Sequence, residues 1–168
     1  MSDQAITDIL DRLRNRFYGK YRGTVTQVDG QRMRIKAKVP SVLAEQESGW
    51  CMACVPYAGK QVGIAFLPEV GAGVWIEFEG GDVSYPIWTG CYWRDGETPS
   101  DAAPGVKVIV SKEHKLLLDD DTPSINLSDS SNNNVALESS GLTLKRGRNQ
   151  IEISDSEVNV NDGALEVI

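Results

Sequence analysis

The last third of the chain is a regular ladder of short segments in which apolar and polar positions alternate. From Val106 onward, apolar residues come in pairs two positions apart, and Asp, Ser, Asn and Gly predominate between the pairs. A spacing of two places both members of a pair on one face of a β-strand, so each segment predicts a very short strand with one apolar face. The pairs are Val106/Val108, Leu116/Leu118, Ile125/Leu127, Val135/Leu137, Leu142/Leu144, Ile151/Ile153, Val158/Val160 and Leu165/Val167.

Strands of this kind are too narrow to make a stable domain from one copy. Each has two inward residues and no aromatic side chain, so the apolar area that it buries is small against the conformational entropy lost on ordering it. Three copies around a shared axis would enclose the apolar residues and pair each strand edge with a neighbouring copy. We therefore expect residues 106–168 to form one third of an intertwined triple-stranded β-helix, a needle built by a homotrimer. A single-chain β-solenoid is the alternative interpretation.

The opening of the chain has a helical period instead. Apolar residues follow the i, i+3, i+4, i+7 spacing of one helix face, and Ser2 and Asp3 suit a helix N-terminus. The sequence therefore predicts an amphipathic helix over residues 1–17. Its apolar face would dock on its own domain, on its own oligomer or on another protein. The residues of this face are Ile6, Ile9, Leu10 and Leu13, continued by Phe17.

Residues 18–93 change to short alternating strands separated by turn residues. Asp29-Gly30 predicts a two-residue hairpin turn between the strands YRGTVTQV and RMRIKAKV, and VGIAFLP, GVWIEF and YPIWTGCYW predict further strands. About five strands without an intervening helix suggest a small barrel of the oligonucleotide/oligosaccharide-binding (OB) type. Every aromatic residue lies before residue 94, and RDGETPSDAAPG, residues 94–105, is typical of a linker. The predicted fold class is thus all-β: an N-terminal helix, an OB barrel and a needle.

One stretch of the predicted barrel has a distinctive order of turns and strands. PEVGAGVWIEFEGGDVSYPIWTGCYW, residues 68–93, contains a proline, a glycine turn, a Val-Trp-Ile-Glu-Phe strand, a Gly-Asp turn, and a second proline before an apolar strand. This order resembles the OB domain of phage baseplate spike proteins and of the VgrG-type spikes of contractile injection systems. The matching positions are Pro68, Gly71, Gly73, Trp75, Glu77, Phe78, Gly81, Asp82, Pro86 and Gly90.

The resemblance implies a homotrimeric, non-enzymatic central spike, because spikes of this family carry a needle after the OB domain. The barrels would dock on a baseplate hub, to which the N-terminal helix would contribute, and the needle would transiently pierce a target cell envelope. Assembly is expected in the bacterial cytoplasm, within a phage tail, a tailocin or a secretion particle. The linker leaves no room for the lysozyme domain of some phage spikes.

The end of the chain departs from another feature of the family. It reads GALEVI, without the His-x-His tip of some short phage spikes. A blunt apolar end would suit a separate tip protein of the PAAR type, with Leu165, Val167 and Ile168 as its contacts.

Charge and composition exclude several other classes. The formal net charge of −7 and the pI of about 4.7 argue against a nucleic-acid partner, which favours a basic surface. No segment approaches the run of about 18 apolar residues that spans a bilayer, and Asp3 and Asp8 interrupt any signal-peptide pattern. Three cysteines do not make a disulfide framework.

Candidate metal ligands are sparse. Cys51 and Cys54 form a C-x-x-C without a second pair, and only Cys91 and His114 could complete a Cys₃His set. We expect buried reduced thiols, no metal and no cofactor. The cluster Asp119-Asp120-Asp121 is better explained as a solvated bend between needle strands than as a calcium site.

Two rival functions remain open. An OB barrel could bind an oligonucleotide or glycan, with Trp50, Tyr57 or Trp93 as stacking platforms. Alternatively, the protein could be a peptidoglycan hydrolase. Glu77 and Glu79 are candidate paired catalytic carboxylates, although their alternation with apolar neighbours already fits the outward positions of a strand.

Overall fold

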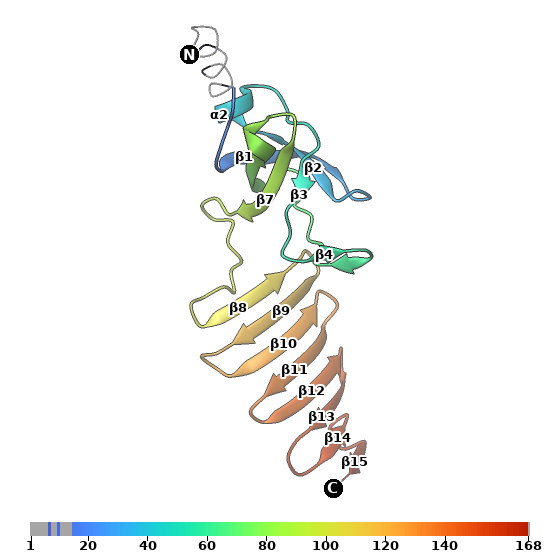
Figure 1. Ribbon diagram of the computed structural model, residues 1–168. Coiled ribbons are helices and arrows are strands. Elements are labelled where there is room, and N and C mark those ends of the chain that lie inside the picture. Colours follow the sequence, from blue (N-terminus) through green and yellow to red (C-terminus); the bar gives the residue numbers. More distant parts are fainter. Residues whose placement is uncertain (1–6, 8–9, 11–14, 168) are drawn as a thin grey trace. The chain divides into compact units, whose positions relative to one another are not determined.

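The computed structural model describes residues 7, 10 and 15–167 of the chain (Figure 1). It divides into two compact units, Met1–Glu97 and Thr98–Ile168. The predicted helix over residues 1–17 lies largely outside the described residues, including Ile6, Ile9 and Leu13, and Leu10 is exposed. Within the described part, no helix has the length and apolar character needed to cross a membrane.

The boundary between the units falls inside the segment predicted as a linker. On its N-terminal side, the Arg94 guanidinium donates a hydrogen bond of 3.1 Å to the carbonyl oxygen of Gly71. On its C-terminal side, Asp101 forms an ion pair of 3.1 Å with Lys115. Residues 94–105 are therefore bonded to the unit on their own side of the boundary.

The N-terminal unit is built on a five-stranded sheet with the order β2-β1-β6-β7-β3. All neighbouring strands are antiparallel except β3 and β7, which are parallel. Its elements are β1 (Tyr21–Asp29), β2 (Arg34–Lys38), α2 (Pro40–Leu43), β3 (Met52–Ala53), β4 (Ala58–Gly59), β5 (Val62–Gly63), β6 (Gly73–Phe78), the 3₁₀ turn η1 (Glu79–Gly81) and β7 (Pro86–Tyr92).

The core of this unit follows from strand alternation. On β6, Val74, Ile76 and Phe78 are buried, whereas Trp75 and Glu77 are not, as expected for a strand with one face on the core. The largest fully buried side chains are Ile35, Ile76, Val25, Val39, Val74 and Cys51. This β-sheet with the short helix α2 is OB-like, as the sequence predicted.

Two local predictions for this unit are wrong. Asp29 pairs with Arg34, so β1 and β2 are joined by a four-residue turn and not by Asp29-Gly30 alone. The Asp29 carboxylate accepts hydrogen bonds of 3.0 Å from the backbone N–H groups of Gln31 and Arg32, which stabilises the longer turn. The predicted strand VGIAFLP is also wrong, because only β5, Val62–Gly63, is paired there, with β4.

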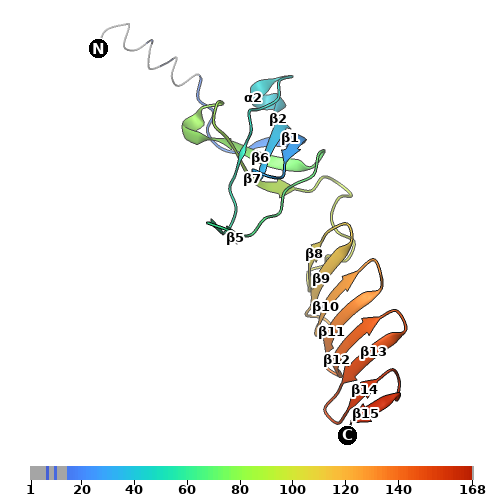
Figure 2. The same ribbon diagram turned by 90° about the vertical axis from the view of Figure 1, so that its right-hand side faces the viewer.

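The C-terminal unit is one eight-stranded sheet whose strands follow one another in chain order (Figure 2). Each strand is antiparallel to the next. The strands are β8 (Val106–Val110), β9 (His114–Asp119), β10 (Ser124–Asp129), β11 (Asn133–Glu138), β12 (Gly141–Arg146), β13 (Asn149–Ile153), β14 (Val158–Val160) and β15 (Leu165–Val167).

The strand pairing corrects the sequence-based picture. We expected strand edges to pair with neighbouring copies, but β8 to β15 pair with one another within the same chain. The turns are short enough for direct hairpins: only Ser139 and Ser140 separate β11 from β12. An antiparallel meander also excludes the single-chain β-solenoid for the described residues. Only the outer edges of β8 and β15 lack a neighbouring strand in this sheet.

Candidate functional site

The C-terminal sheet presents two straight rows of apolar residues on one face. In an antiparallel pair, directly opposite residues lie on the same side of the sheet, so the register defines both rows. The first row is Leu118, Ile125, Leu137, Leu142, Ile153, Val158 and Val167. The second is Leu116, Leu127, Val135, Leu144, Ile151, Val160 and Leu165. We call these rows the apolar face.

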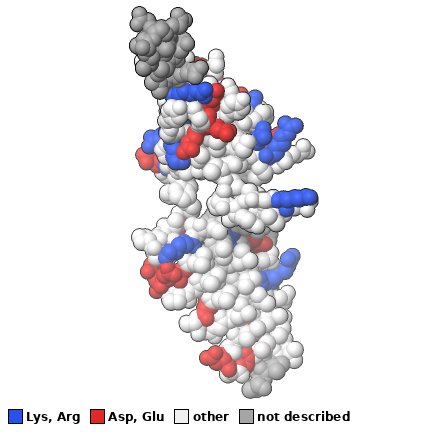
Figure 3. Space-filling model, viewed as in Figure 1, with Lys and Arg blue, Asp and Glu red and all other residues white. Residues whose placement is uncertain are grey.

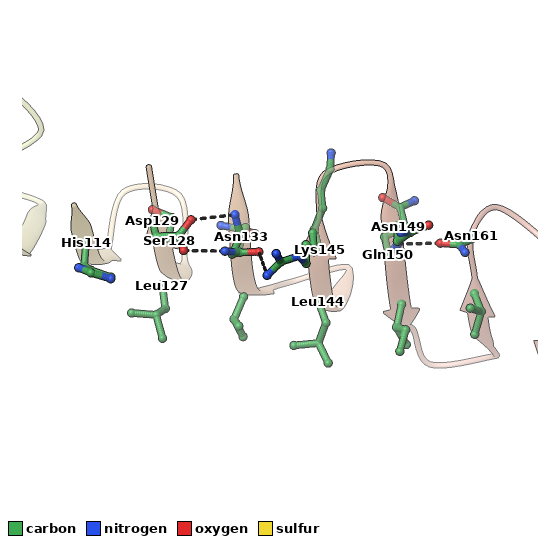
Figure 4. A pocket seen from close by; sticks show the side chains of 15 residues that line it. His114, Leu127, Ser128, Asp129, Asn133, Leu144, Lys145, Asn149, Gln150 and Asn161 are labelled. Atoms are coloured by element: carbon green, nitrogen blue, oxygen red, sulfur yellow. Dashed lines mark hydrogen bonds between the residues drawn. The ribbon is translucent and has the colours of Figure 1, made fainter. Parts of the chain in front are cut away.

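The apolar face is open to solvent in the single chain. Leu127 is 52% exposed, Leu137 47% and Leu165 60%. Figure 4 shows Leu127 and Leu144 projecting to the same side of the sheet. A groove of about 580 Å³ follows the second row, and its apolar wall is formed by Leu127, Val135, Leu144, Ile151 and Val160. A continuous exposed apolar surface of this kind marks an interaction site.

Fourteen of the sixteen predicted needle-core residues belong to the two rows, and Val106 and Val108 do not. Val108 lies opposite Leu117 and Val106 opposite Asp119, which places both valines on the other face of the sheet. Their prediction as core residues of the apolar face is therefore wrong. Ile109, which lies opposite Leu116 and is 52% exposed, takes this position on β8.

A polar border runs beside the second row. The Asp129 carboxylate accepts hydrogen bonds from the backbone N–H groups of Ser131 (2.8 Å) and Asn133 (3.0 Å) and from the Asn133 side chain (2.6 Å). These bonds, with the side chain of Asn133 as the largest cause, hold the pKa of Asp129 below its usual value. The hydrogen bonds of Asp129 with Ser131 and Asn133 thus close the β10–β11 turn, and they do not cover the two apolar rows.

Several OB motif residues make contacts that shape this unit. Gly73 is buried, and a Cβ there would contact the Tyr92 ring at 2.8 Å, so glycine lets β6 and the ring approach. The Tyr92 and Trp75 rings lie 5.1 Å apart, with the Arg22 guanidinium 5.6 Å from each ring centroid. Glu77 forms an ion pair of 2.7 Å with Lys20, and this contact accounts for a carboxylate at this position of β6.

The Gly-Asp turn of the motif anchors the chain that precedes β1. Gly81 has φ = +77°, and its carbonyl oxygen accepts a hydrogen bond of 2.8 Å from the backbone N–H of Phe17. Asp82 accepts one of 3.0 Å from Ser84 and forms an ion pair of 3.0 Å with Arg16. The pKa of Asp82 is lowered mainly by hydrogen bonding to Ser84, with a smaller contribution from Arg16.

The other motif positions shape turns and strand ends. Gly71 has φ = +93° in the turn before β6, and its N–H donates to Val25. Pro86 is buried opposite Phe78, whose side chain joins the core. Gly90, with φ = +146°, lies beside an irregularity in the β6–β7 register. Pro68 is half-buried.

The candidate ligand-binding aromatics do not form one platform. The ring of Trp50 is contacted by the Lys36 ammonium, 5.1 Å from its centroid. Tyr57 lines a separate cavity beside β4 and β5, and Trp93 is 66% exposed. Among the ring contacts of the described residues, none joins two of these three side chains.

The cysteines differ from the prediction of three buried thiols. Cys51 is buried, but Cys54 and Cys91 are exposed. Within the described residues, no three His, Cys, Asp or Glu side chains are grouped to hold a metal ion. Asp119 instead closes the β9–β10 turn, because its carboxylate accepts hydrogen bonds of 2.9 Å from the N–H groups of Asp121 and Thr122.

The predicted tip contacts are only partly described. Leu165 is exposed at the end of the second row, Val167 occupies the end of the first row by register, and Ile168 lies outside the described residues.

Comparison with known families assigns both units. Residues 21–93 match the family model of the type VI secretion system/phage-baseplate injector OB domain. Residues 106–166 match the model of the phage baseplate V C-terminal trimerisation domain. No curated protein gave a significant match. The first match spans the five-stranded sheet, and the second runs from the start of β8 into β15.

Proposed function

Because the chain belongs to the family of phage-baseplate and injection-system spike proteins, we propose that three copies form the central spike of a contractile tail or injection system. The N-terminal unit is an injector OB domain and the C-terminal unit is a trimerisation domain. The needle formed by that domain would be the part that enters the target envelope.

One observation carries the proposal: the strand register aligns apolar residues from β9 to β15 in two uninterrupted rows, yet many of these residues are exposed in a single copy. Its rows contain leucine, isoleucine and valine and no aromatic residue, which suits a narrow shared interior. Three sheets whose apolar faces point to a common axis would remove these residues from water, and the gain in free energy scales with the buried apolar area. The polar faces of the sheets would then form the surface of a triple-stranded needle.

The strand pairing supports a mechanical role. Seven consecutive antiparallel pairs connect β8 to β15 within each chain, so bending the needle would require breaking backbone hydrogen bonds in all three sheets. The OB domains, with the segment before β1 anchored at Gly81 and Asp82, would form a collar that docks on the baseplate hub. Contraction of the particle would then drive the needle into the envelope. This role requires no catalysis.

The C-terminal end would accept a further protein. β15 is the outer strand of the sheet and has one edge without a neighbouring strand, and Leu165 within β15 is exposed. An unpaired edge binds another chain through its backbone groups. We place a PAAR-type tip protein there, in contact with Leu165, Val167 and Ile168.

Size-exclusion chromatography with light scattering tests the proposal. The expected mass of the purified chain is near three times 18.4 kDa, and electron microscopy should show a collar with one narrow rod. A folded monomer in dilute solution would refute the needle. Hub docking is tested separately, by co-purification of the hub protein of the parent particle with the full chain.

A further inference from the structure

The strand ends and turns of the C-terminal sheet form two lateral edges, one at each end of the strands, and these two edges differ in charge. In a meander, alternate turns lie at the same edge. The β9–β10, β11–β12 and β13–β14 turns lie at one edge, and the β8–β9, β10–β11, β12–β13 and β14–β15 turns lie at the other. We compare the turn residues and the strand residues that flank them directly.

The first edge is acidic throughout, and we call it the acidic edge. Its turns and flanking residues contain no Lys or Arg, and its carboxylates are those of Asp119, Asp120, Asp121, Glu138, Asp155 and Glu157. Asp120 forms an ion pair with Lys107 of β8. Figure 3 shows acidic groups gathered along one margin of the unit that holds β8 to β15.

The second edge carries every Lys and Arg of the turns, and we call it the arginine edge. Its cations are Lys112, Arg146 and Arg148, beside the carboxylates of Glu113, Asp129 and Asp162. Arg146 and Arg148 flank Gly147 in the two-residue turn between β12 and β13. This turn therefore concentrates two guanidinium groups at one point of the edge.

These guanidinium groups have no carboxylate partner within the described chain. Arg146 donates one long hydrogen bond, of 3.5 Å, to the side-chain oxygen of Asn133. Arg148 is exposed and makes no ion pair among the described residues. On the acidic edge, Asp155 is likewise exposed and makes none. Each edge thus carries a charge, Arg148 on one and Asp155 on the other, that makes no ion pair among the described residues.

We infer that the arginine edge of one copy docks on the acidic edge of the next copy, and that this pairing favours the cyclic three-fold arrangement over a pairing of like edges. The inference rests on the trimer proposed above. A three-fold rotation brings one edge of each sheet to the opposite edge of its neighbour, which is a heterologous contact that closes after three copies. The occupant of each edge is therefore a second copy of this chain.

The charges also disfavour the wrong arrangement. A two-fold pairing through like edges would bring two acidic edges together, with repeated carboxylates and no Lys or Arg in the turns. Like charges at an interface act against an incorrect partner. The apolar face supplies the driving force for association, and the edges favour the arrangement in which opposite edges meet.

Charge reversal at the β12–β13 turn tests the inference in the full chain. Arg148→Glu should lower the Tm of the trimer by about 3–6 °C at low ionic strength, since three exposed contacts are each reversed. The loss should shrink by at least half at about 500 mM NaCl, because salt screens exposed charges. Lys145→Glu is the matched control: it changes the net charge equally only three residues away, but Lys145 lies within β12, on the face of the sheet opposite to that of Leu144.

A compensating reversal identifies the partner edge. Arg148→Glu combined with Asp155→Arg or with Asp121→Arg should restore at least half of the lost Tm for one of the two combinations. Equal effects of Arg148→Glu and Lys145→Glu, a loss that does not depend on salt, or no restoration by either combination would overturn the inference. The mass of the wild-type protein distinguishes failure of the trimer from failure of the edge pairing. A monomeric wild type refutes the trimer and this inference together, whereas a trimer insensitive to edge reversal refutes only the edge pairing.

Discussion

Val160 of β14 lies directly opposite Ile151 of β13, so both residues lie on the apolar face near the C-terminal end of the sheet. In a trimer, Val160→Asp would place three carboxylates around one axis without partners, which is strongly unfavourable in an apolar interior. We expect this variant to lose the trimeric mass or to lower the Tm of the trimer by more than about 10 °C. Light scattering and thermal unfolding by far-UV circular dichroism measure both effects.

Asn159→Asp provides the control for this substitution. Asn159 is the neighbouring residue and pairs with Glu152 and Glu166 on the other face of the sheet, so its carboxylate would stay in water, where about 150 mM salt screens its repulsion by these two glutamates. Its Tm should remain close to that of the wild type. If the two variants behave alike, the apolar face is not the interior of the needle.

Gly141 begins β12 with φ = +142°, and a Cβ there would collide with the backbone carbonyl oxygen of Ile153. Gly141→Ala should therefore destabilise the sheet by about 3 kcal/mol or more, because strain and a backbone clash combine. Gly147 offers a matched comparison, since its φ is +60° and a Cβ there would meet no atom of the described residues within 4 Å. Gly147→Ala should cost only about 1 kcal/mol, measured by denaturant unfolding. Equal losses would contradict the clash.

The rows of the apolar face could be predicted from the sequence because two-residue periodicity survives in every strand from β9 to β15. The partner of each strand could not be read from that period. It is encoded in turn length: Ser139-Ser140 and Gly147-Arg148 leave two residues between strands, which favours hairpins within the chain. Periodicity thus specifies which face is apolar, and turn length specifies which strands pair.

The first strand of the sheet shows where periodicity is ambiguous. β8 reads Val-Lys-Val-Ile-Val, so both of its faces carry an apolar residue. The pair two apart, Val106 and Val108, lies on the face of Leu117, where Asp101 from the preceding segment binds Lys115. The spacing of apolar residues in this strand is compatible with either orientation, so the sequence pattern alone does not decide which face carries Ile109.

The three thiols should differ in reactivity. Cys51 is buried, its sulfur lies 3.3 Å from the Ser48 hydroxyl oxygen, and burial raises its pKa. Cys54 is exposed, and desolvation raises the pKa of the Cys91 thiol. Because the thiolate is the reactive form, a thiol reagent at pH 8 should modify Cys54 first, Cys91 more slowly and Cys51 only after unfolding. Cys54→Ser should remove the fastest phase. Rapid labelling of Cys51 in the native protein would contradict the buried position.

The ionised Asp82 carboxylate makes the stability of the Gly-Asp turn depend on pH. Its pKa lies below the usual value of 3.8, mainly because Ser84 hydrogen-bonds to the ionised form. The stabilisation is therefore fully present above pH 3.8 and is lost as the pH falls through the lower pKa of the folded state. We expect Asp82→Asn to reduce the Tm of the N-terminal unit near neutral pH, with the difference from the wild type narrowing in acid. All four tryptophans precede residue 94, so tryptophan fluorescence reports this unit alone.

Asp95→Asn is the control for the pH series, because Asp95 is exposed and makes no hydrogen bond or ion pair through its carboxylate among the described residues. Its Tm should follow that of the wild type at every pH. An Asp82→Asn difference that stays constant from neutral to acidic pH would mean that the ionised carboxylate does not hold the turn. The anchoring of Arg16 and Phe17 would then depend on the backbone of Gly81, whose carbonyl oxygen accepts the hydrogen bond of Phe17 at any pH.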